Sequence, residues 1–290
     1  GLADLERREL RSVSSYIFYD DPSRILRLIR FQVRFGMTLD ERTANQLENA
    51  RLAEMPAAIP PPAKRRELRA LAHEPLAAQV LELLDQQKLA TLFAPALTGA
   101  KLNGPGFAKL EKARQLLPFG IDLRTDDLAI FLSILTEKLS AKEAAALVKQ
   151  CGLVRSDTDH WQKLEAKSKA LEKLLKSPKL KKPSQVHAAA AAAPGEQILF
   201  LLMHSSQRLV VDRLKNHLQR YLVTASEVTD AEVEATGVKP GTPKFAKAKN
   251  ELIATRLDAR PKKVVTEEPA EATPPPPTDS RGGGWRSRSK

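Results

Sequence analysis

The residues with the clearest chemical potential lie near the start of the chain, in Asp20-Asp21-Pro22-Ser23-Arg24. An Asp and an Arg three positions apart project from adjacent turns of one helix face. A carboxylate accepts a hydrogen bond from an amine, and a guanidinium donates in its plane to a ring nitrogen or a carbonyl oxygen. Asp21 and Arg24 therefore suit a flat polar group that presents an amine beside an acceptor. An ordinary N-capped helix with solvated arginines has the same pattern.

Other chemistries find little support in the residue spacing. Asp157-Thr158-Asp159 has the form of a metal-binding D-x-D, but at the start of an expected helix N-capping is the better interpretation. Cys151 has no base at a fixed spacing, and no P-loop or G-x-G-x-x-G segment occurs. We therefore assign no catalytic and no metal-binding residue. The histidines are never four positions apart with a supporting carboxylate, as a metal site would favour; they are His73, His160, His187, His204 and His217.

The composition indicates a basic protein of a reducing compartment. Of the 290 residues, 47 are Lys or Arg and 35 are Asp or Glu, which gives a formal net charge of +12 and a pI near 9.8. This excess favours a polyanionic partner, with nucleic acid ahead of a lipid surface. A single cysteine excludes an internal disulfide and fits a cytoplasmic location. No apolar run is long enough to predict a membrane span.

Apolar residues recur every three or four positions, which predicts an all-α fold built as an elongated helical array. Asp20 as N-cap, Pro22 in the first turn and Gly36 after the last turn delimit a first helix. Residues 259–290, which include Pro274–Pro277 and an Arg/Gly-rich end, are expected to be disordered. Asp40 is expected to cap a helix near 40–54, Pro60-Pro61-Pro62 to interrupt the helices, and Ser140-Ala141-Lys142-Glu143 to form a capping box. Further helices are expected near 63–72, 75–87, 107–117, 125–138, 141–150, 157–176, 184–193, 195–204 and 207–223, and a short unit near 229–257.

Two N-terminal segments together resemble a known family. They are Gly1-Leu2-Ala3-Asp4-Leu5 and the run from Asp20 to Arg27, which continues to Arg30-Phe31. They resemble the class II tRNA nucleotidyltransferases and bacterial poly(A) polymerases. In that family D-P-[FY]-G-G-x-x-D-L closes the catalytic head, and [ED]-D-x-x-R-x-x-R-x-x-R-F opens the neck. Gly1 and Asp4 match the second glycine and the aspartate of the first motif, so the resemblance implies that a head precedes residue 1.

The resemblance implies roles for the charged residues of the first helix. Asp21 and Arg24 would form the protein template that selects CTP and ATP, because cytosine and adenine both present an amine beside a ring acceptor. Arg27, one turn further on, would reach the triphosphate or orient Asp21. Asp20 would serve as cap or supporting partner. Magnesium, the cofactor of the reaction, is expected in the head and not on this chain.

A second neck segment of the family has the form I-S-x-E-R-I-x-x-E-L, and the stretch from Ile59 to Leu68 resembles it. Glu67 and Leu68 are retained. Pro62 and Ala63 stand where the family has Glu-Arg, so this chain departs from the motif at that charged pair.

RNA contacts are expected at both ends of the folded part. Arg30 and Arg34 of the first helix are two of them. The other three, Lys239, Gly241 and Lys244, belong to a segment that resembles the family's tail motif K-P-G-P before a helix. Glycines in that motif let backbone N–H groups and a helix N-terminus approach a phosphate. A plain turn before a helix has the same residues, and both interpretations stay open.

These features predict the neck, body and tail of an RNA 3′-end nucleotidyltransferase, which would perform tRNA CCA addition or polyadenylation from CTP and ATP. Residues 1–19 would be the end of the head motif and a linker, 20–95 the neck, 96–258 the body and tail, and 259–290 a disordered tail. The chain itself lacks the catalytic carboxylates, so the enzyme would be the longer parent. Two alternatives are a non-catalytic helical RNA-binding adaptor and a helical protein-interaction scaffold.

Overall fold

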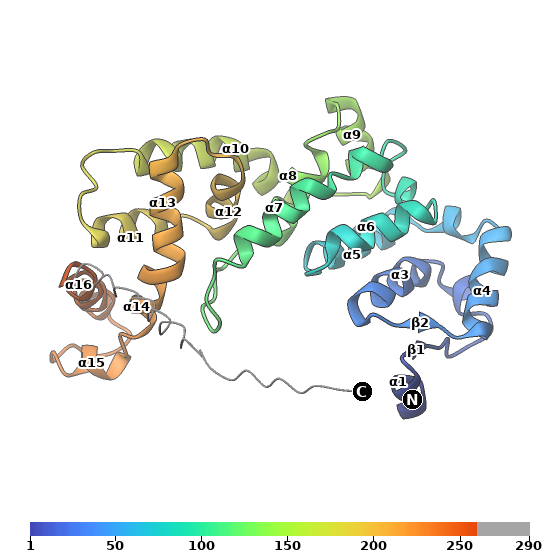
Figure 1. Ribbon diagram of the computed structural model, residues 1–290, viewed down its shortest axis with the longest axis horizontal. Coiled ribbons are helices and arrows are strands. Elements are labelled where there is room, and N and C mark those ends of the chain that lie inside the picture. Colours follow the sequence, from blue (N-terminus) through green and yellow to red (C-terminus); the bar gives the residue numbers. More distant parts are fainter. Residues whose placement is uncertain (260–290) are drawn as a thin grey trace, which may run out of the picture. The chain divides into compact units, whose positions relative to one another are not determined.

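The computed structural model describes residues 1–259, and helices make up nearly all of them (Figure 1). The only sheet in these residues is a parallel pair of two-residue strands, β1 (Glu9–Leu10) and β2 (Thr38–Leu39). The all-α class expected from the sequence is confirmed. The disordered tail expected from 259 onward lies, apart from its first residue, outside the described part of the chain.

The helix α3 (Ser23–Phe35) carries the candidate site residues and is held by its apolar face. Its side chains Ile25, Leu26 and Ile29 are at most 2 % exposed. Gly36 ends the helix in the left-handed conformation, with φ of 58°, as the sequence predicted. The neighbouring elements are α1 (Leu2–Arg7), α2 (Ile17–Asp20) and α4 (Glu41–Leu52).

The helix α5 (Pro61–Ala72) packs against α3 and begins earlier than the sequence suggested. Pro61 and Pro62 form its first turn, at a place where the prolines predicted a break. Proline is tolerated in a first turn because those N–H groups have no intrahelical partner. The chain continues through α6 (Ala77–Gln86), α7 (Gly104–Arg114), α8 (Asp127–Thr136) and α9 (Ala141–Gln150), with 3-10 turns at Met55–Ala58, Ala90–Leu92 and Gly99–Leu102.

The remaining helices follow the predicted pattern closely. The stretch expected as one helix over 207–223 is continuous but contains a π-helical turn at His217–Tyr221. The elements are α10 (Arg155–Leu175), α11 (Pro183–Ala191), α12 (Gly195–His204), α13 (Arg208–Asn216), α14 (Leu222–Ser226), α15 (Asp230–Glu234) and α16 (Pro243–Ala259).

Buried apolar side chains form three clusters within residues 1–258. The first includes Leu68, Phe93 and Phe131 and spans both sides of position 96. The second joins α10 to α13, and the third joins α15 to α16. The boundary between a neck and a body near position 96 therefore stays a prediction.

Within the described residues, no single helix has the length and apolar character needed to cross a membrane. By length and composition, α11 and α12 could do so only together, as a pair bent by 111°.

Candidate functional site

Asp21 and Arg24 lie together at the start of α3. Asp21 Oδ2 is 3.4 Å from Arg24 Nε, and both side chains are partly open to solvent, at 38 % and 44 % exposure. Asp21 Oδ1 accepts hydrogen bonds from the backbone N–H of Ser23 at 3.1 Å and from its hydroxyl at 2.5 Å. The hydroxyl bond, helped by the N–H bond and by Arg24, holds the pKa of Asp21 below its ordinary value. The carboxylate is therefore ionised at neutral pH and fixed in orientation.

Asp20 does not cap α3, which corrects the sequence prediction. It is the last residue of α2, its side chain is exposed, and the backbone turns at Asp21 before α3 begins. Asp21 instead receives the N–H of Ser23, the first residue of α3. The helix α2 ends at Asp20, so the chain turns at Asp21. This turn places the Asp21 carboxylate, and not that of Asp20, within reach of the Ser23 N–H.

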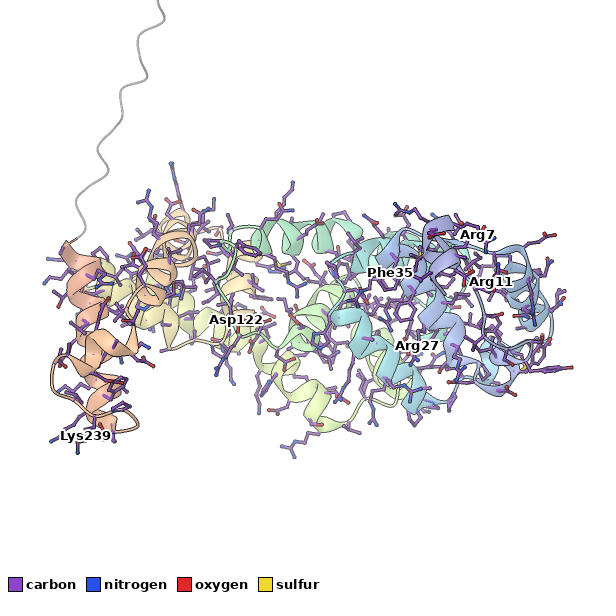
Figure 2. All side chains as sticks on the ribbon, turned by 90° about the horizontal axis from the view of Figure 1, so that it is seen from below. Arg7, Arg11, Arg27, Phe35, Asp122 and Lys239 are labelled. Atoms are coloured by element: carbon purple, nitrogen blue, oxygen red, sulfur yellow. The ribbon has the colours of Figure 1, made fainter. Side chains whose placement is uncertain are left out.

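Two buried carboxylates tie the arginines of α3 to α5 and the residues after it. Glu67 and Glu74 have side chains only 3 % and 2 % exposed. Glu67 Oε1 lies 3.4 Å from the guanidinium of Arg27, whose position on α3 is labelled in Figure 2. Glu74 Oε1 receives hydrogen bonds from Arg30 at 2.7 Å and Arg34 at 3.3 Å. Glu67 thus has a structural partner in α3, although its charged neighbours in the family motif are missing.

Arg30 is buried, which corrects its assignment as an RNA contact. Its side chain is 10 % exposed, and its guanidinium lies between Glu67 and Glu74. It also lies over the Phe31 ring, 4.8 Å from the centroid. Packing of α3 against α5 and α6 draws this arginine inward, so we give it a structural role. Arg34 remains half exposed, at 51 %.

The candidate tail motif forms a turn between α15 and α16. Gly237 and Gly241 have φ of 83° and 76°, in the region where glycine is favoured. The Thr242 hydroxyl accepts the N–H of Phe245 at 3.2 Å and so caps the start of α16. Lys239 lies at the tip of the turn (Figure 2) and, like Lys244, is exposed. No hydrogen bond or ion pair between described residues links this turn to α3, so phosphate binding here stays a prediction.

The D-x-D segment acts as a helix cap, as the sequence predicted. Asp157 is buried at the start of α10, where it accepts the N–H of Val154 at 2.9 Å and pairs with Arg69 of α5. No group of three or more His, Cys, Asp or Glu in residues 1–259 could hold a metal ion. The magnesium implied by the family resemblance therefore finds no ligand set in this part of the chain.

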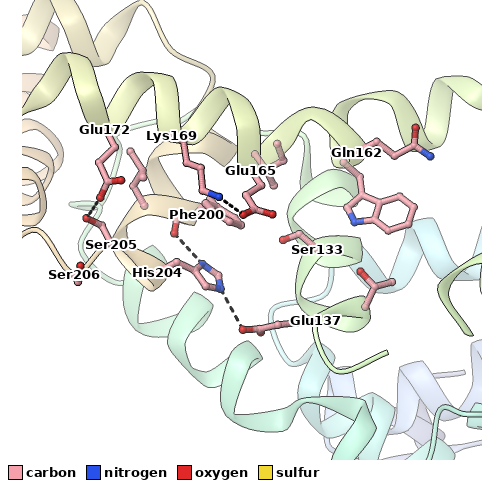
Figure 3. A pocket seen from close by; sticks show the side chains of 14 residues that line it. Ser133, Glu137, Gln162, Glu165, Lys169, Glu172, Phe200, His204, Ser205 and Ser206 are labelled. Carbon is pink, nitrogen blue, oxygen red and sulfur yellow. Dashed lines mark hydrogen bonds and ion pairs between the residues drawn. The ribbon is translucent and has the colours of Figure 1, made fainter. Parts of the chain in front are cut away.

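A hollow of about 700 Å³ lies between α8, α10 and α12 (Figure 3). Its charged side chains are largely occupied with one another. Lys169 donates to Glu165 at 2.6 Å, and His204 Nε2 lies 3.5 Å from Glu137. None of the site residues predicted from the sequence lines it. We assign it no ligand.

Two residues that no sequence motif singles out lie near the candidate site. Arg66 of α5 donates to the Ser23 hydroxyl at 3.4 Å, so a second guanidinium stands beside the Asp21–Arg24 pair. Glu74 anchors Arg30 and Arg34. These contacts join positions forty to forty-four residues apart, and no local spacing signals them.

Solved structures of tRNA-processing enzymes have a similar fold. A tRNA-processing enzyme complex has a TM-score of 0.54 at 20 % identity, covering 89 % of this chain and 68 % of the other. An apo tRNA-processing enzyme has a TM-score of 0.53 at 20 % identity, covering 89 % and 65 %. The CCA-adding enzyme of Thermotoga maritima with tRNA_CCA has a TM-score of 0.50 at 20 % identity, covering 91 % and 63 %.

These similarities show the fold that this chain shares with CCA-adding tRNA-processing enzymes. The chain spans roughly two thirds of their length, from 63 % to 68 %. No protein-family model matches the sequence. No curated protein matches it significantly either.

Proposed function

We propose that this chain is the nucleotide-selecting and RNA-binding part of an RNA 3′-end nucleotidyltransferase, which performs tRNA CCA addition or polyadenylation in the cytoplasm. The observation that carries the proposal is the exposed Asp21–Arg24 pair at the start of α3. The fold similarity to tRNA-processing enzymes and the net charge of +12 support it.

The geometry of the pair accounts for a preference between bases. Asp21 Oδ1 is occupied by Ser23, which leaves Oδ2 as the acceptor nearest Arg24. An ionised carboxylate can only accept, so it requires an amine, and the neighbouring guanidinium requires an acceptor. Cytosine and adenine offer that order of groups. Uracil and guanine place a carbonyl where the amine should lie. Once the bound base covers the pair, the carboxylate would then lack a donor, at a cost of about 1–3 kcal/mol.

Neighbouring residues complete the proposed interface. Arg27 is fixed by Glu67 yet remains 43 % exposed, so its charge is available to a triphosphate. Arg34, Lys239, Gly241 and Lys244 are the proposed RNA contacts. Magnesium would supply charge neutralisation for phosphoryl transfer when bound, but no described ligand set fits it, and we derive no step through it.

The test is equilibrium binding of CTP, ATP, UTP and GTP to the chain and to Asp21→Ala, Arg24→Ala and Arg208→Ala. Arg208 pairs with Asp212 on the exposed face of α13 and serves as the matched control. We expect the unchanged chain to prefer CTP and ATP, and each site variant to lose roughly ten- to two-hundredfold of that preference. Arg208→Ala should retain it.

The outcomes separate the alternative functions. A chain that binds RNA but prefers no nucleotide would contradict nucleotide selection and favour an RNA-binding adaptor. A chain that binds neither would favour an interaction scaffold. If both Asp21→Ala and Arg24→Ala keep the preference for CTP and ATP, these two residues have no role in nucleotide selection and only begin a helix.

A further inference from the structure

A lysine-rich loop joins α10 to α11, with the sequence Lys176-Ser177-Pro178-Lys179-Leu180-Lys181-Lys182. All of its lysine side chains are exposed. Leu180 is partly buried and packs on the second apolar cluster. Leu180 therefore anchors the loop, and the lysine side chains face solvent.

Charge repulsion and conformational entropy both oppose an ordered conformation of this loop. Four like charges within seven residues repel one another. Fixing the backbone of each residue also costs conformational entropy. The contact of Leu180 alone is too small to offset this cost, so other contacts must hold the loop.

Arg213 of α13 supplies the first of these contacts. Its guanidinium donates to the carbonyl oxygens of Leu175, of Ser177 at 3.1 Å and of Leu180 at 2.6 Å. The Leu175 carbonyl ends α10 and has no intrahelical partner, and a cation is favoured at that negative end of the helix dipole. One side chain thus caps α10 and fixes the first half of the loop.

Gln185 of α11 holds the second half. Its side-chain oxygen accepts the N–H groups of Lys181 at 2.9 Å and Lys182 at 3.1 Å. The backbone of the loop is therefore held from two helices, and within residues 1–259 no lysine side chain of the loop donates a hydrogen bond that would hold it.

The lysine charges of the loop are hardly neutralised within the described part of the chain. No described carboxylate lies within 4.0 Å of Lys176, Lys179 or Lys181, and Lys182 lies at that limit from Asp258. By contrast, Lys163 and Lys169 on the exposed face of α10 each pair with a carboxylate at 2.6 Å. The loop presents unpaired ammonium groups on a fixed backbone.

We infer that residues 176–182 form a preorganised phosphate-binding loop for RNA and that Arg213 is its positioning residue. Ammonium groups that replace condensed counterions on an RNA backbone gain affinity by counterion release. A backbone that is already ordered pays less entropy on binding. Leu180 packs inward, so Pro178 is the one apolar side chain of the loop that is exposed, which is little apolar area to offer a lipid bilayer. The inference rests on the proposed RNA-binding function and extends it to a segment far from α3 in sequence.

The test compares two double variants that remove the same charge. Lys179→Ala/Lys181→Ala removes two free lysines of the loop, and Lys163→Ala/Lys169→Ala removes two paired lysines of α10. Binding of a fluorescent tRNA acceptor-stem hairpin is measured by anisotropy over a range of salt concentrations. We expect the loop variant to bind between about ten- and a hundredfold more weakly at 0.1 M salt, with a log–log salt slope smaller by about 2. The α10 variant should stay within about twofold of the unchanged chain.

Arg213→Ala tests the positioning role against Arg208→Ala, which removes the same charge from the same helix. We expect Arg213→Ala to weaken RNA binding, to lower the salt slope and to speed amide hydrogen exchange in 176–182. Arg213→Lys, which can reach fewer carbonyls, should restore only part of the binding. If Arg213→Ala fails to fold, the double lysine variants still decide the role of the loop.

Failure of the inference and failure of the proposed function give different results. Salt-dependent RNA binding that is equal in the two lysine double variants would overturn the phosphate-binding loop and leave the proposed function intact. Absence of RNA binding by the unchanged chain at low salt would overturn both. Binding to phosphatidylserine vesicles that disappears in Lys179→Ala/Lys181→Ala, with RNA binding unchanged, would assign the loop to lipid headgroups and overturn the inference.

Discussion

Two arginines on α3 share one carboxylate oxygen and differ in burial, which allows a sharp prediction about stability. Arg30 and Arg34 lie 2.7 Å and 3.3 Å from Glu74 Oε1. The Arg30 side chain is 10 % exposed and the Arg34 side chain 51 %. We expect Arg30→Ala to cost far more free energy of unfolding than Arg34→Ala, although both remove a positive charge from the same partner.

The magnitude follows from what each substitution leaves behind. Among residues 1–259, Arg30 is the only arginine that lies beside both Glu67 and Glu74, which are 3 % and 2 % exposed. Removing one partner from a buried ion pair costs roughly 3–5 kcal/mol, because an uncompensated charge stays in a poorly solvated site. A half-exposed pair contributes roughly 1 kcal/mol or less. Domains are stable by about 5–15 kcal/mol, so Arg30→Ala should remove a large share.

Urea unfolding followed by circular dichroism measures the difference at constant pH. Adding Glu74→Gln to Arg30→Ala should recover part of the loss, because a neutral amide needs less compensation than a carboxylate. The double-mutant cycle then gives the coupling energy. A loss of unfolding free energy below about 1 kcal/mol in both Arg30→Ala and Glu74→Gln would refute a buried ion pair between α3 and Glu74. Strict additivity of the two losses in the double variant would refute it as well.

Three further predictions concern groups away from α3. Burial, and then the charge of His187, lowers the pKa of His217 from 6.5 to about 3. The fold therefore favours neutral imidazole, and stability should fall by about 1 kcal/mol per pH unit from pH 6.5 toward 3, a loss that His217→Phe should remove in acid-unfolding curves. Burial raises the pKa of Cys151 to about 12, so its thiol should react with a disulfide reagent at pH 8 only as fast as the protein opens. With tRNA, magnesium, CTP and ATP, the chain should yield no extended product on a sequencing gel; extension would reveal an active site in it.

The sequence predicted those features that local spacing controls. The Asp40 side chain caps α4 and Ser140 forms a capping box with Glu143, because both motifs act within one helical turn. Asp21 and Arg24 also meet, but not on one helix face as their spacing predicted, because Asp21 precedes α3 with φ of −143°. Helix starts at prolines are less predictable, because proline can either interrupt a helix or occupy its first turn. Pro61 and Pro62 occupy the first turn of α5, which packs against α3.

The partners of the charged residues could not be predicted because they are distant in sequence. Nothing near Arg30 indicates that Glu67 and Glu74 will meet it. The same limit applies to Arg213, whose three carbonyl partners belong to α10 and the loop after it. A charge count treats all of these groups as solvated, so it overestimates the free positive surface wherever a guanidinium is used inside the fold.

Helix geometry nevertheless contains a signal for the burial of Arg30. With about 100° of rotation per residue, the direction of Arg30 lies about 90° from the mean direction of Ile25, Leu26 and Ile29, whereas Arg24 and Arg27 lie about 150° away. The arginine nearest the apolar stripe is the one that the neighbouring helices enclose, and it needs buried carboxylates to be tolerated. The arginines on the opposite side stay available to a ligand. A spacing of three residues along a helix with 3.6 residues per turn thus divides one arginine-rich segment into a structural residue and candidate binding residues.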